Sequence, residues 1–323
     1  MAERLTRRAF LAGAAALAAG RALGAAGDVL GAEPARYPEI DLSRFDTPIP
    51  RGPFEVRFGY AAITWGGNDR QAIDEIAEVG FRGIQLRANV LQTFGERPGE
   101  LADLLRARNL TFVALSSGSV RLEGEAEAAQ IDRHVAHARF LRSAGGLYLQ
   151  VTDARPKGRT VGPADYERLG RLLTEIGRRT ADLGIPLGYH NHMDSLGERP
   201  EEVDAVLAAS DPRYVRLELD VAHYVQGGGD PAAAIERHAE RLLFLHVKDV
   251  ESPVPGDPSR PYRFVELGRG RVDLPGVFAA LERVRFRGWA IVELDAVPVP
   301  GRTPKESAII NRRYLEEVLK LKV

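Results

Sequence analysis

Four side chains that can bind a divalent metal stand at the ends of four apolar runs in the second half of this 323-residue chain. They are His190, Asp220, His246 and Glu293, and the runs span residues 185–190, 215–220, 242–246 and 289–293. In a barrel of parallel strands, the C-terminal strand ends meet at one mouth, where the chemistry takes place. Imidazole nitrogens and carboxylate oxygens that converge there match the ligands of a divalent ion. We therefore predict a metal site formed by these four residues.

Strand periodicity indicates that these side chains point into the barrel. Side chains alternate between faces along a strand, so a residue two positions away shares the face of each predicted ligand. The resulting pairs are His190 with His192, Glu218 with Asp220, His246 with Lys248, and Glu293 with Asp295. Parallel strands are covered on both faces, and buried charges must be paired or bind metal. Such a site suits Mn, Co, Fe, Zn or Mg; the alternative is a network of salt bridges at the barrel mouth.

Three further residues near these strand ends are candidates for catalysis. His192 is a candidate base or substrate ligand, and the alternative is a hydrogen bond that supports a metal ligand. His223 is expected to line the same mouth. Lys248 beside a divalent ion should have a lowered pKa because both are cations, and it could then donate a proton to a leaving oxygen. The alternative for Lys248 is an ion pair with Asp249 or Asp295.

The rest of the chain predicts the scaffold that must position these residues. From residue 54 onward, eight strand-like runs alternate with eight helix-like runs. Such alternation is typical of a parallel sheet, and eight pairs favour closure into a (β/α)8 barrel. We therefore predict an α/β fold with a single TIM barrel domain over residues 54–323. The strands are expected at 55–63, 82–87, 110–116, 146–152, 185–191, 214–220, 242–248 and 289–294, and the helices at 70–79, 98–108, 125–144, 164–183, 199–209, 231–240, 275–284 and 305–320.

The N-terminal segment predicts export. Arg7 and Arg8 precede a short run of Ala, Leu and Gly, an order that resembles a twin-arginine signal. The run contains Arg21, so a permanent membrane span is not expected. We predict a signal over residues 1–32, a linker over residues 33–53 and a periplasmic or otherwise exported protein. The alternative is an N-terminal arm without a targeting role.

Composition excludes several kinds of partner and site. The formal net charge is −1 and no basic stripe is interleaved with aromatic residues, so nucleic acid is not an expected partner. The chain has no cysteine, which excludes disulfides, thiolate metal sites and cysteine nucleophiles. A hydrophobic content of 44% is enough for a large core. The expected partner is a small molecule, and an oligomer of the chain is an open alternative.

The segment over residues 251–275 is long for a connection between the seventh strand and the seventh helix, and such loops commonly have a function. We predict that it acts as a lid over the barrel mouth. Gln85 and Arg87 end the second strand, where they could contact substrate hydroxyls. Trp65 follows the first strand and could stack on the face of a substrate; the alternative is packing at the rim.

Two histidines outside the strand ends have a simpler interpretation. His134 and His137 lie three residues apart on a charged helix-like run. Metal binding there would need a further ligand from elsewhere in the fold. We therefore expect a solvated helix face at this position.

The ordered motifs at the strand ends resemble the xylose isomerase-like superfamily of sugar isomerases and epimerases, including its inosose dehydratase-like branch. The resemblance covers most of residues 54–321 and implies a (β/α)8 barrel with one divalent metal ion held by Glu, Asp, His and Glu at strands five to eight. Asp220, His246 and Glu293 match three of these positions, and the resemblance implies that His223 contacts substrate. The segments that carry it are Gly-Tyr-His-Asn-His at 188–192, Leu-Asp-Val-Ala-His at 219–223, His-Val-Lys-Asp at 246–249, Leu-Gly-Arg-Gly at 267–270 and Val-Glu at 292–293.

His190 departs from this pattern, because it stands where the epimerases have Glu. In those enzymes the resemblance implies that this Glu is both a metal ligand and a proton-transfer base. An imidazole that binds metal through its basic nitrogen cannot perform both roles. Glu198 could supply the fourth ligand from the following loop, but we favour its assignment to the first turn of the next helix.

The resemblance implies a metal-dependent isomerase or epimerase that acts on a sugar or ketosugar. It would abstract a proton next to a carbonyl and pass through an enediolate. The same intermediate leads to elimination, so the alternative is a lyase, either inosose dehydratase-like or acting on a ketoglycoside, and His190 favours it. A phosphodiester hydrolase such as endonuclease IV would need more metal ligands and basic loops. A non-catalytic sugar-binding barrel is the alternative from another class.

Overall fold

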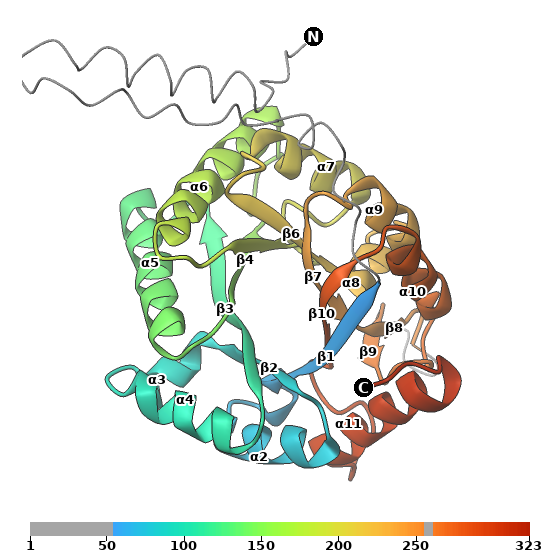
Figure 1. Ribbon diagram of the computed structural model, residues 1–323. Coiled ribbons are helices and arrows are strands. Elements are labelled where there is room, and N and C mark those ends of the chain that lie inside the picture. The colour runs from blue at the N-terminus through green and yellow to red at the C-terminus, as the bar shows by residue number, and fades with distance from the viewer. Residues whose placement is uncertain (1–53, 255–260) are drawn as a thin grey trace, which may run out of the picture. The chain divides into compact units, whose positions relative to one another are not determined.

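The computed structural model describes residues 54–254 and 261–323, which form a closed parallel barrel surrounded by helices (Figure 1). The strand order is β1-β10-β7-β6-β5-β4-β3-β2, and pairing of β1 with β10 closes the barrel. This confirms the predicted (β/α)8 fold. The predicted signal over residues 1–32 and linker over residues 33–53 lie outside the described residues and stay predictions. The barrel strands are β1 (Glu55–Ala61), β2 (Gly83–Arg87), β3 (Thr111–Arg121), β4 (Tyr148–Ala154), β5 (Leu187–His190), β6 (Val215–Asp220), β7 (Leu242–Val247) and β10 (Arg287–Val292).

Helices follow the strands as the sequence predicts, with differences at some ends. The predicted helix over 305–320 ends at Arg313, where a π-helical turn begins, and the third strand continues past residue 116 to Arg121. None of the described helices is long and apolar enough to cross a membrane. The helices are α2 (Asp69–Val79), α3 (Leu91–Phe94), α4 (Pro98–Ala107), α5 (Glu127–Ser143), α6 (Pro163–Ala181), α7 (Pro200–Ala209), α8 (Val221–Gln226), α9 (Pro231–Arg237), α10 (Leu274–Arg283) and α11 (Pro304–Arg313).

The main core lies between the barrel and its helices. In α6, the buried apolar side chains recur at helical spacing and include Leu169, Leu172, Leu173 and Ile176. Burial of a side chain of this size stabilises the fold by about 1.5–3 kcal/mol relative to exposure. The helix begins at Pro163, whose ring suits a first helical position. Packing of this kind holds the strands rigidly, and the site depends on that rigidity.

The register of β5, β6 and β7 determines which polar side chains are neighbours. His190 pairs with Glu218, and Asp220 pairs with His246. Beyond the end of β5, the Asn191 side chain donates to the Asp220 carbonyl and accepts from the Asp220 N–H, at 3.1 and 2.9 Å. These two bonds fix the ends of β5 and β6 against each other.

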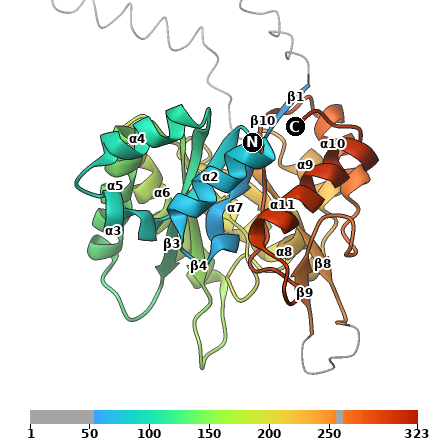
Figure 2. The same ribbon diagram turned by 90° about the horizontal axis from the view of Figure 1, so that it is seen from below.

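The segment predicted to act as a lid, residues 251–275, begins at the last residue of β8 (Asp249–Glu251) and includes β9 (Arg263–Val265), which pairs with β8 as an antiparallel hairpin at one end of the barrel (Figure 2). Residues 255–260 of this segment lie outside the described residues. The Asp249 carboxylate accepts backbone N–H groups from Gly268, Gly270 and Val272, at 2.9–3.1 Å. Asp249 therefore anchors the chain that follows the hairpin, so it is not the ion-pair partner of Lys248.

Candidate metal and catalytic site

The four predicted metal ligands come together at the ends of β5, β6, β7 and β10. His246 Nδ1 lies 3.6 Å from Asp220 Oδ2 and 3.4 Å from Glu293 Oε1. Ligand atoms of His190, Asp220 and His246 lie within 4.8 Å of one another. Nitrogen and oxygen donors at this separation can share a single divalent ion with small adjustments of the side chains.

Buried polar atoms without hydrogen bonds support the same position for an ion. Asp220 Oδ2, His246 Nδ1 and His190 Nδ1 have no hydrogen-bond partner within the described part of the chain. Asp220 Oδ1, by contrast, accepts the N–H groups of Ala222 and His223 at 2.8 Å and so begins α8. A buried polar atom without a partner costs about 1–3 kcal/mol. A bound cation would relieve this cost, so the residues fit a divalent metal.

The two buried imidazoles have pKa values shifted in opposite directions. Burial by itself would lower the pKa of His246, but the Glu218 and Glu293 carboxylates raise that pKa well above its usual value. Burial, together with the nearby His246 and His192, holds the pKa of His190 well below its usual value. His190 therefore keeps a free lone pair at neutral pH, as a metal ligand must.

Glu218 is a buried carboxylate that the sequence analysis placed on the face of Asp220 but did not assign to the site. Its Oε1 lies 2.8 Å from His246 Nε2 and 3.6 Å from His190 Nδ1. Burial raises the pKa of Glu218 to about 7, although His246 acts in the opposite direction. Glu218 could have been assigned to the site from the sequence, because it is a charged residue between two leucines of a strand that is expected to be buried.

Lys248 forms ion pairs inside the mouth. Its Nζ lies 2.6 Å from Asp295 Oδ1 and 3.0 Å from Glu293 Oε1. Although burial would lower the pKa of Lys248, Glu293 and Asp295 raise it. In the chain without an ion, the carboxylates around the amine therefore outweigh its burial; the lowered pKa expected beside a bound divalent ion stays a prediction. The ammonium group also lies over the Phe264 ring, 3.8 Å from its centre.

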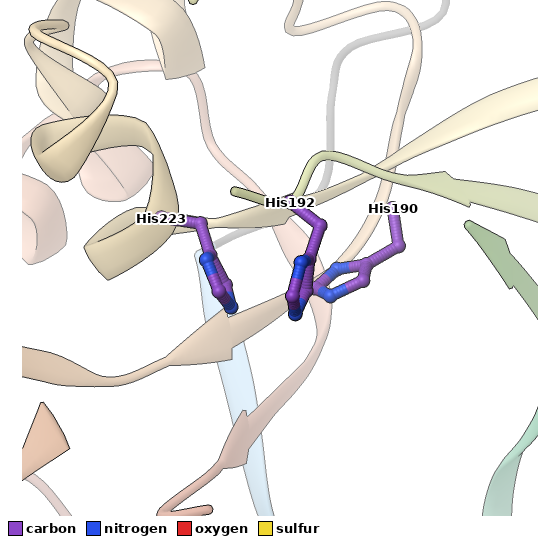
Figure 3. Close-up of side chains that lie close together, drawn as sticks. All are labelled: His190, His192 and His223. Carbon is purple, nitrogen blue, oxygen red and sulfur yellow. The ribbon is translucent and has the colours of Figure 1, made fainter. Parts of the chain in front are cut away.

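His192 and His223 stand side by side, and His190 lies next to them (Figure 3). The ring centres of His192 and His223 are 3.8 Å apart. His192 Nδ1 lies 2.6 Å from the Met193 carbonyl oxygen, and the Met193 N–H donates to His223 Nδ1 at 3.1 Å. Burial, followed by Lys248 and His192, holds the pKa of His223 well below its usual value. Both predicted catalytic histidines therefore lie at the site.

A cavity of about 210 Å³ opens beside these residues. One side of the cavity is lined by His190, His192 and Glu293, and the other by polar side chains from β2, β3 and β4 that are neutral except for Arg87. Gln85 and Arg87 were predicted from the sequence, but the others were not, because hydroxyl and amide groups at strand ends are common. The neutral and basic lining side chains are Gln85, Arg87, Ser116, Ser119, Gln150 and Thr152.

Two other candidates lie outside this cavity. Trp65 is buried at the rim, where its Nε1 donates to Glu75 at 2.6 Å, so packing rather than sugar stacking describes it. Glu198 accepts the Asp194 N–H at 2.8 Å and precedes α7. Two groups of potential metal ligands occur among the described residues, His190 with Asp220 and His246, and His190 with His192 and His223; neither contains Glu198 or Glu293, and Glu293 is assigned from its 3.4 Å distance to His246.

The expectation of a solvated helix face at His134 and His137 is wrong. His134 is fully buried, and both Nδ1 atoms contact Ser117 Oγ, at 2.6 and 2.8 Å. Ser117 lies where the pairing of β3 with β4 is irregular, next to Gly118 with φ of 90°. The bulge turns Ser117 toward α5 while Ser116 and Ser119 line the cavity.

Comparison with known proteins places the chain among enzymes of this architecture. The family model described as "Xylose isomerase-like TIM barrel" matches residues 73–318. The rhizopine catabolism protein MocC of Rhizobium meliloti is 29% identical over 294 residues, covering 78% of this chain and 86% of that protein. Inosose dehydratase of Lacticaseibacillus casei is 25% identical over 304 residues, covering 82% and 98%.

Solved structures show the same fold. The IolI protein, crystallised with a bound zinc atom, has a TM-score of 0.70 at 17% identity and covers 82% of this chain and 98% of its own. A sugar phosphate isomerase/epimerase from Parabacteroides distasonis has a TM-score of 0.64 at 19% identity and covers 85% and 100%.

Proposed function

Because the chain belongs to the xylose isomerase-like TIM barrel family, we propose that it is a metal-dependent enzyme that removes a proton next to the carbonyl of a sugar or ketosugar. We further propose that the reaction is elimination of water or of another β-substituent. The names of the relatives support this choice, since inosose dehydratase aligns over 98% of its own length. Isomerisation, which uses the same intermediate, is the second candidate.

The proposed metal ligands are His190, Asp220, His246 and Glu293, whose donor atoms converge in the barrel mouth. When bound, a divalent ion would polarise the substrate carbonyl and stabilise negative charge on its oxygen. Lys248, held by Glu293 and Asp295, adds a fixed positive charge beside these ligands. Because two carboxylates hold Lys248 in its charged form, its proposed role is electrostatic rather than that of a proton carrier.

The observation that carries the proposal is the pair of contacts made by the Met193 peptide groups. A carbonyl oxygen only accepts, so His192 Nδ1 must carry the proton, and His192 Nε2 has a free lone pair in the neutral ring. A backbone N–H only donates, so His223 Nδ1 is unprotonated, and the proton of the neutral ring is on Nε2, which lies 3.9 Å from Asp220 Oδ2 and 3.4 Å from Lys248 Nζ. Met193 thus leaves a lone pair on Nε2 of His192, which lines the cavity, and directs the proton of His223 toward Asp220.

The two rings have different parts in the proton chemistry. His192 lines the cavity, and its Nε2 takes the proton from the carbon next to the carbonyl. His223 does not line the cavity and acts through Lys248, whose Nζ lies 3.4 Å from His223 Nε2 and whose charge faces the developing oxyanion. Protonated His192 then gives this proton to the leaving oxygen as its bond to carbon breaks, and water or an alcohol departs. His192 is regenerated, so no oxidant or reductant is needed.

The opposite wall of the cavity favours chemistry on one face of the substrate. Among the described lining residues, β2, β3 and β4 contribute amides, hydroxyls and Arg87, but no carboxylate or imidazole. Epimerisation requires a proton to leave one face and return to the other. Elimination and isomerisation both proceed with the single base that His192 provides, so we retain isomerisation and not epimerisation as the second candidate.

Incubation of the metal-loaded protein with ketosugars and ketoinositols in deuterated water tests the proposal. Elimination is expected to release water and give an unsaturated carbonyl product with new ultraviolet absorption. Isomerisation would instead yield a sugar of unchanged mass apart from deuterium at the carbon next to the carbonyl. A protein that binds sugars equally well with and without metal, and exchanges no proton, would be a non-catalytic binding barrel.

A further inference from the structure

We propose that Gln85 is a positioning residue that orients the ligand His246 toward the metal and the amide of Gln150 toward the substrate. This inference rests on the proposed metal-dependent function and assigns a role to residues outside the ligand set. Gln85 lies on β2, His246 on β7 and Gln150 on β4, so the chain of contacts crosses the barrel. Gln85 and Gln150 are 2% and 4% exposed, respectively.

The first step concerns the proton on His246. Nε2 of this ring has two oxygen neighbours at 2.8 Å, Gln85 Oε1 and Glu218 Oε1. An amide oxygen only accepts, so Nε2 carries the proton and donates to Gln85 Oε1. Nδ1 faces Asp220 Oδ2 and Glu293 Oε1, and it offers its lone pair there once a metal ion has displaced the second proton of the ring. Metal-binding histidines commonly have their other ring nitrogen fixed in this way.

The second step transfers this orientation to Gln150. Because the oxygen of the Gln85 amide receives the His246 proton, its NH2 group must point away from the ring. That group donates to Gln150 Oε1 at 3.0 Å. The Gln150 amide is thereby oriented with its oxygen occupied, and no partner for its nitrogen occurs among the described residues.

The consequence is a directional chain that ends at the cavity. Gln150 lines the cavity, so its NH2 group is a donor for an acceptor oxygen of the substrate. A sugar hydroxyl or carbonyl oxygen fits this position. Each amide in the chain accepts with its oxygen and donates with its nitrogen, so the protonation of His246 determines the orientation at the substrate end.

Three variants separate the two roles of Gln85. Gln85→Met keeps the volume but removes both hydrogen bonds; Gln85→Glu keeps an acceptor for His246 but cannot donate to Gln150 in its ionised form. Gln150→Met removes only the substrate end. Metal affinity is measured by competition of Zn²⁺ or Co²⁺ with a chromophoric chelator, and the Co²⁺ absorption spectrum reports ligand geometry. KM is measured with whichever substrate the deuterium experiment identifies.

We expect Gln85→Met to weaken metal binding by about 10- to 100-fold, which is typical for loss of a group that orients a ligand. Gln85→Glu is expected to restore metal affinity and the Co²⁺ spectrum, yet to share the raised KM of Gln150→Met. Gln150→Met should bind metal like the wild type. In the zinc-loaded wild type, long-range ¹⁵N–¹H NMR correlations should show that Nε2 of His246 carries the proton.

Wild-type metal affinity and spectrum in a folded Gln85→Met protein would overturn the positioning role. So would a zinc-loaded wild type with the proton of His246 on Nδ1, a result that does not depend on any variant. Failure of the proposed function looks different: the wild type would bind no more metal than Asp220→Ala, whatever residue occupies position 85.

Discussion

The two halves of the barrel mouth carry different chemistry. The half formed by β5, β6, β7 and β10 presents the imidazoles and carboxylates of the proposed metal site, with Lys248 among them. The half formed by β2, β3 and β4 presents amides and hydroxyls, with Arg87 at their edge. Both halves lie at C-terminal strand ends, so the fold does not account for the contrast.

The contrast indicates a division of labour between holding an ion and recognising hydroxyl groups. Buried charges need an opposite charge or a metal, and on the first half several carboxylate and imidazole atoms have no hydrogen-bond partner in the described residues. On the second half, neutral groups can exchange water for sugar hydroxyls at little cost. Substitutions on the two halves should therefore fail in different measurements.

The largest expected effect is loss of a carboxylate ligand. Asp220→Asn, which keeps an acceptor for the first turn of α8, should lower bound metal from about one equivalent to near zero. Turnover should fall by at least about 1,000-fold, because a metal contributes several kcal/mol of transition-state stabilisation. Elemental analysis and steady-state kinetics measure the two quantities, and a chelator should reproduce the loss in the wild type.

Glu293→Gln should behave like Asp220→Asn, whereas Thr152→Val on the neutral half should retain its metal. If all three proteins bound one equivalent of metal, the assignment of the charged half as a metal site would be wrong.

The next largest effect is a loss of kcat, without a change in metal content, when the histidines assigned to proton transfer are replaced. His192→Gln should lower kcat by at least about 100-fold, the lower end of the range for a general base. His223→Gln should lower kcat by only about 10-fold, because His223 acts on the substrate through its contact with Lys248 rather than directly. Equal losses of kcat in the two variants would contradict the different roles assigned to His192 and His223. Loss of bound metal from His192→Gln would show that His192 is itself a metal ligand.

The charged half could be predicted from sequence because its residue types are rare in buried strands. Asp220, His246 and Glu293 follow apolar runs, and the period of two along each strand identifies the inward face. The eight strand–helix pairs were predictable for the same reason, since a barrel strand and an amphipathic helix have different hydrophobic periods.

The neutral half could not be predicted in the same way. Ser116 and Ser119 face the cavity only because β3 has an irregularity between them, with Gly118 at positive φ. A strict alternation would place them on opposite faces. The roles of Met193 and Gln85 depend on backbone and amide contacts between distant strands, and no local pattern in the sequence reports such contacts.

A smaller effect is expected on the neutral half itself. Thr152 Oγ1 is buried without a hydrogen bond to any described residue, although Thr152 lines the cavity. If it binds a substrate hydroxyl, Thr152→Val should raise KM by about 3- to 10-fold, equivalent to one hydrogen bond of roughly 0.5–1.5 kcal/mol. Metal content should stay the same. An unchanged KM with a higher melting temperature would mean that Thr152 faces the cavity without contacting substrate.

The smallest effect on the reaction is expected at His134, which lies outside the barrel mouth. Like His246 it is buried, but no carboxylate is among the groups that shift its pKa. Burial, with help from Arg133 and His137, lowers the pKa of His134 to about 3. Between that value and about 6.5, the usual pKa of histidine, the unfolded chain binds a proton at this position and the folded chain does not. Stability should therefore be retained above about pH 6.5 and lost as the pH falls toward 3.

In the metal-free protein, His134→Gln removes this titration. The variant should start less stable at pH 8, because it loses the contact with Ser117, but its decline below pH 6.5 should be shallower by about 1 kcal/mol per pH unit. Urea unfolding at several pH values measures the slopes, and contributions shared by both proteins cancel in their difference. Parallel slopes would show that His134 becomes protonated without unfolding. In that case Ser117 and the bulge of β3, rather than burial, would govern the behaviour of this histidine.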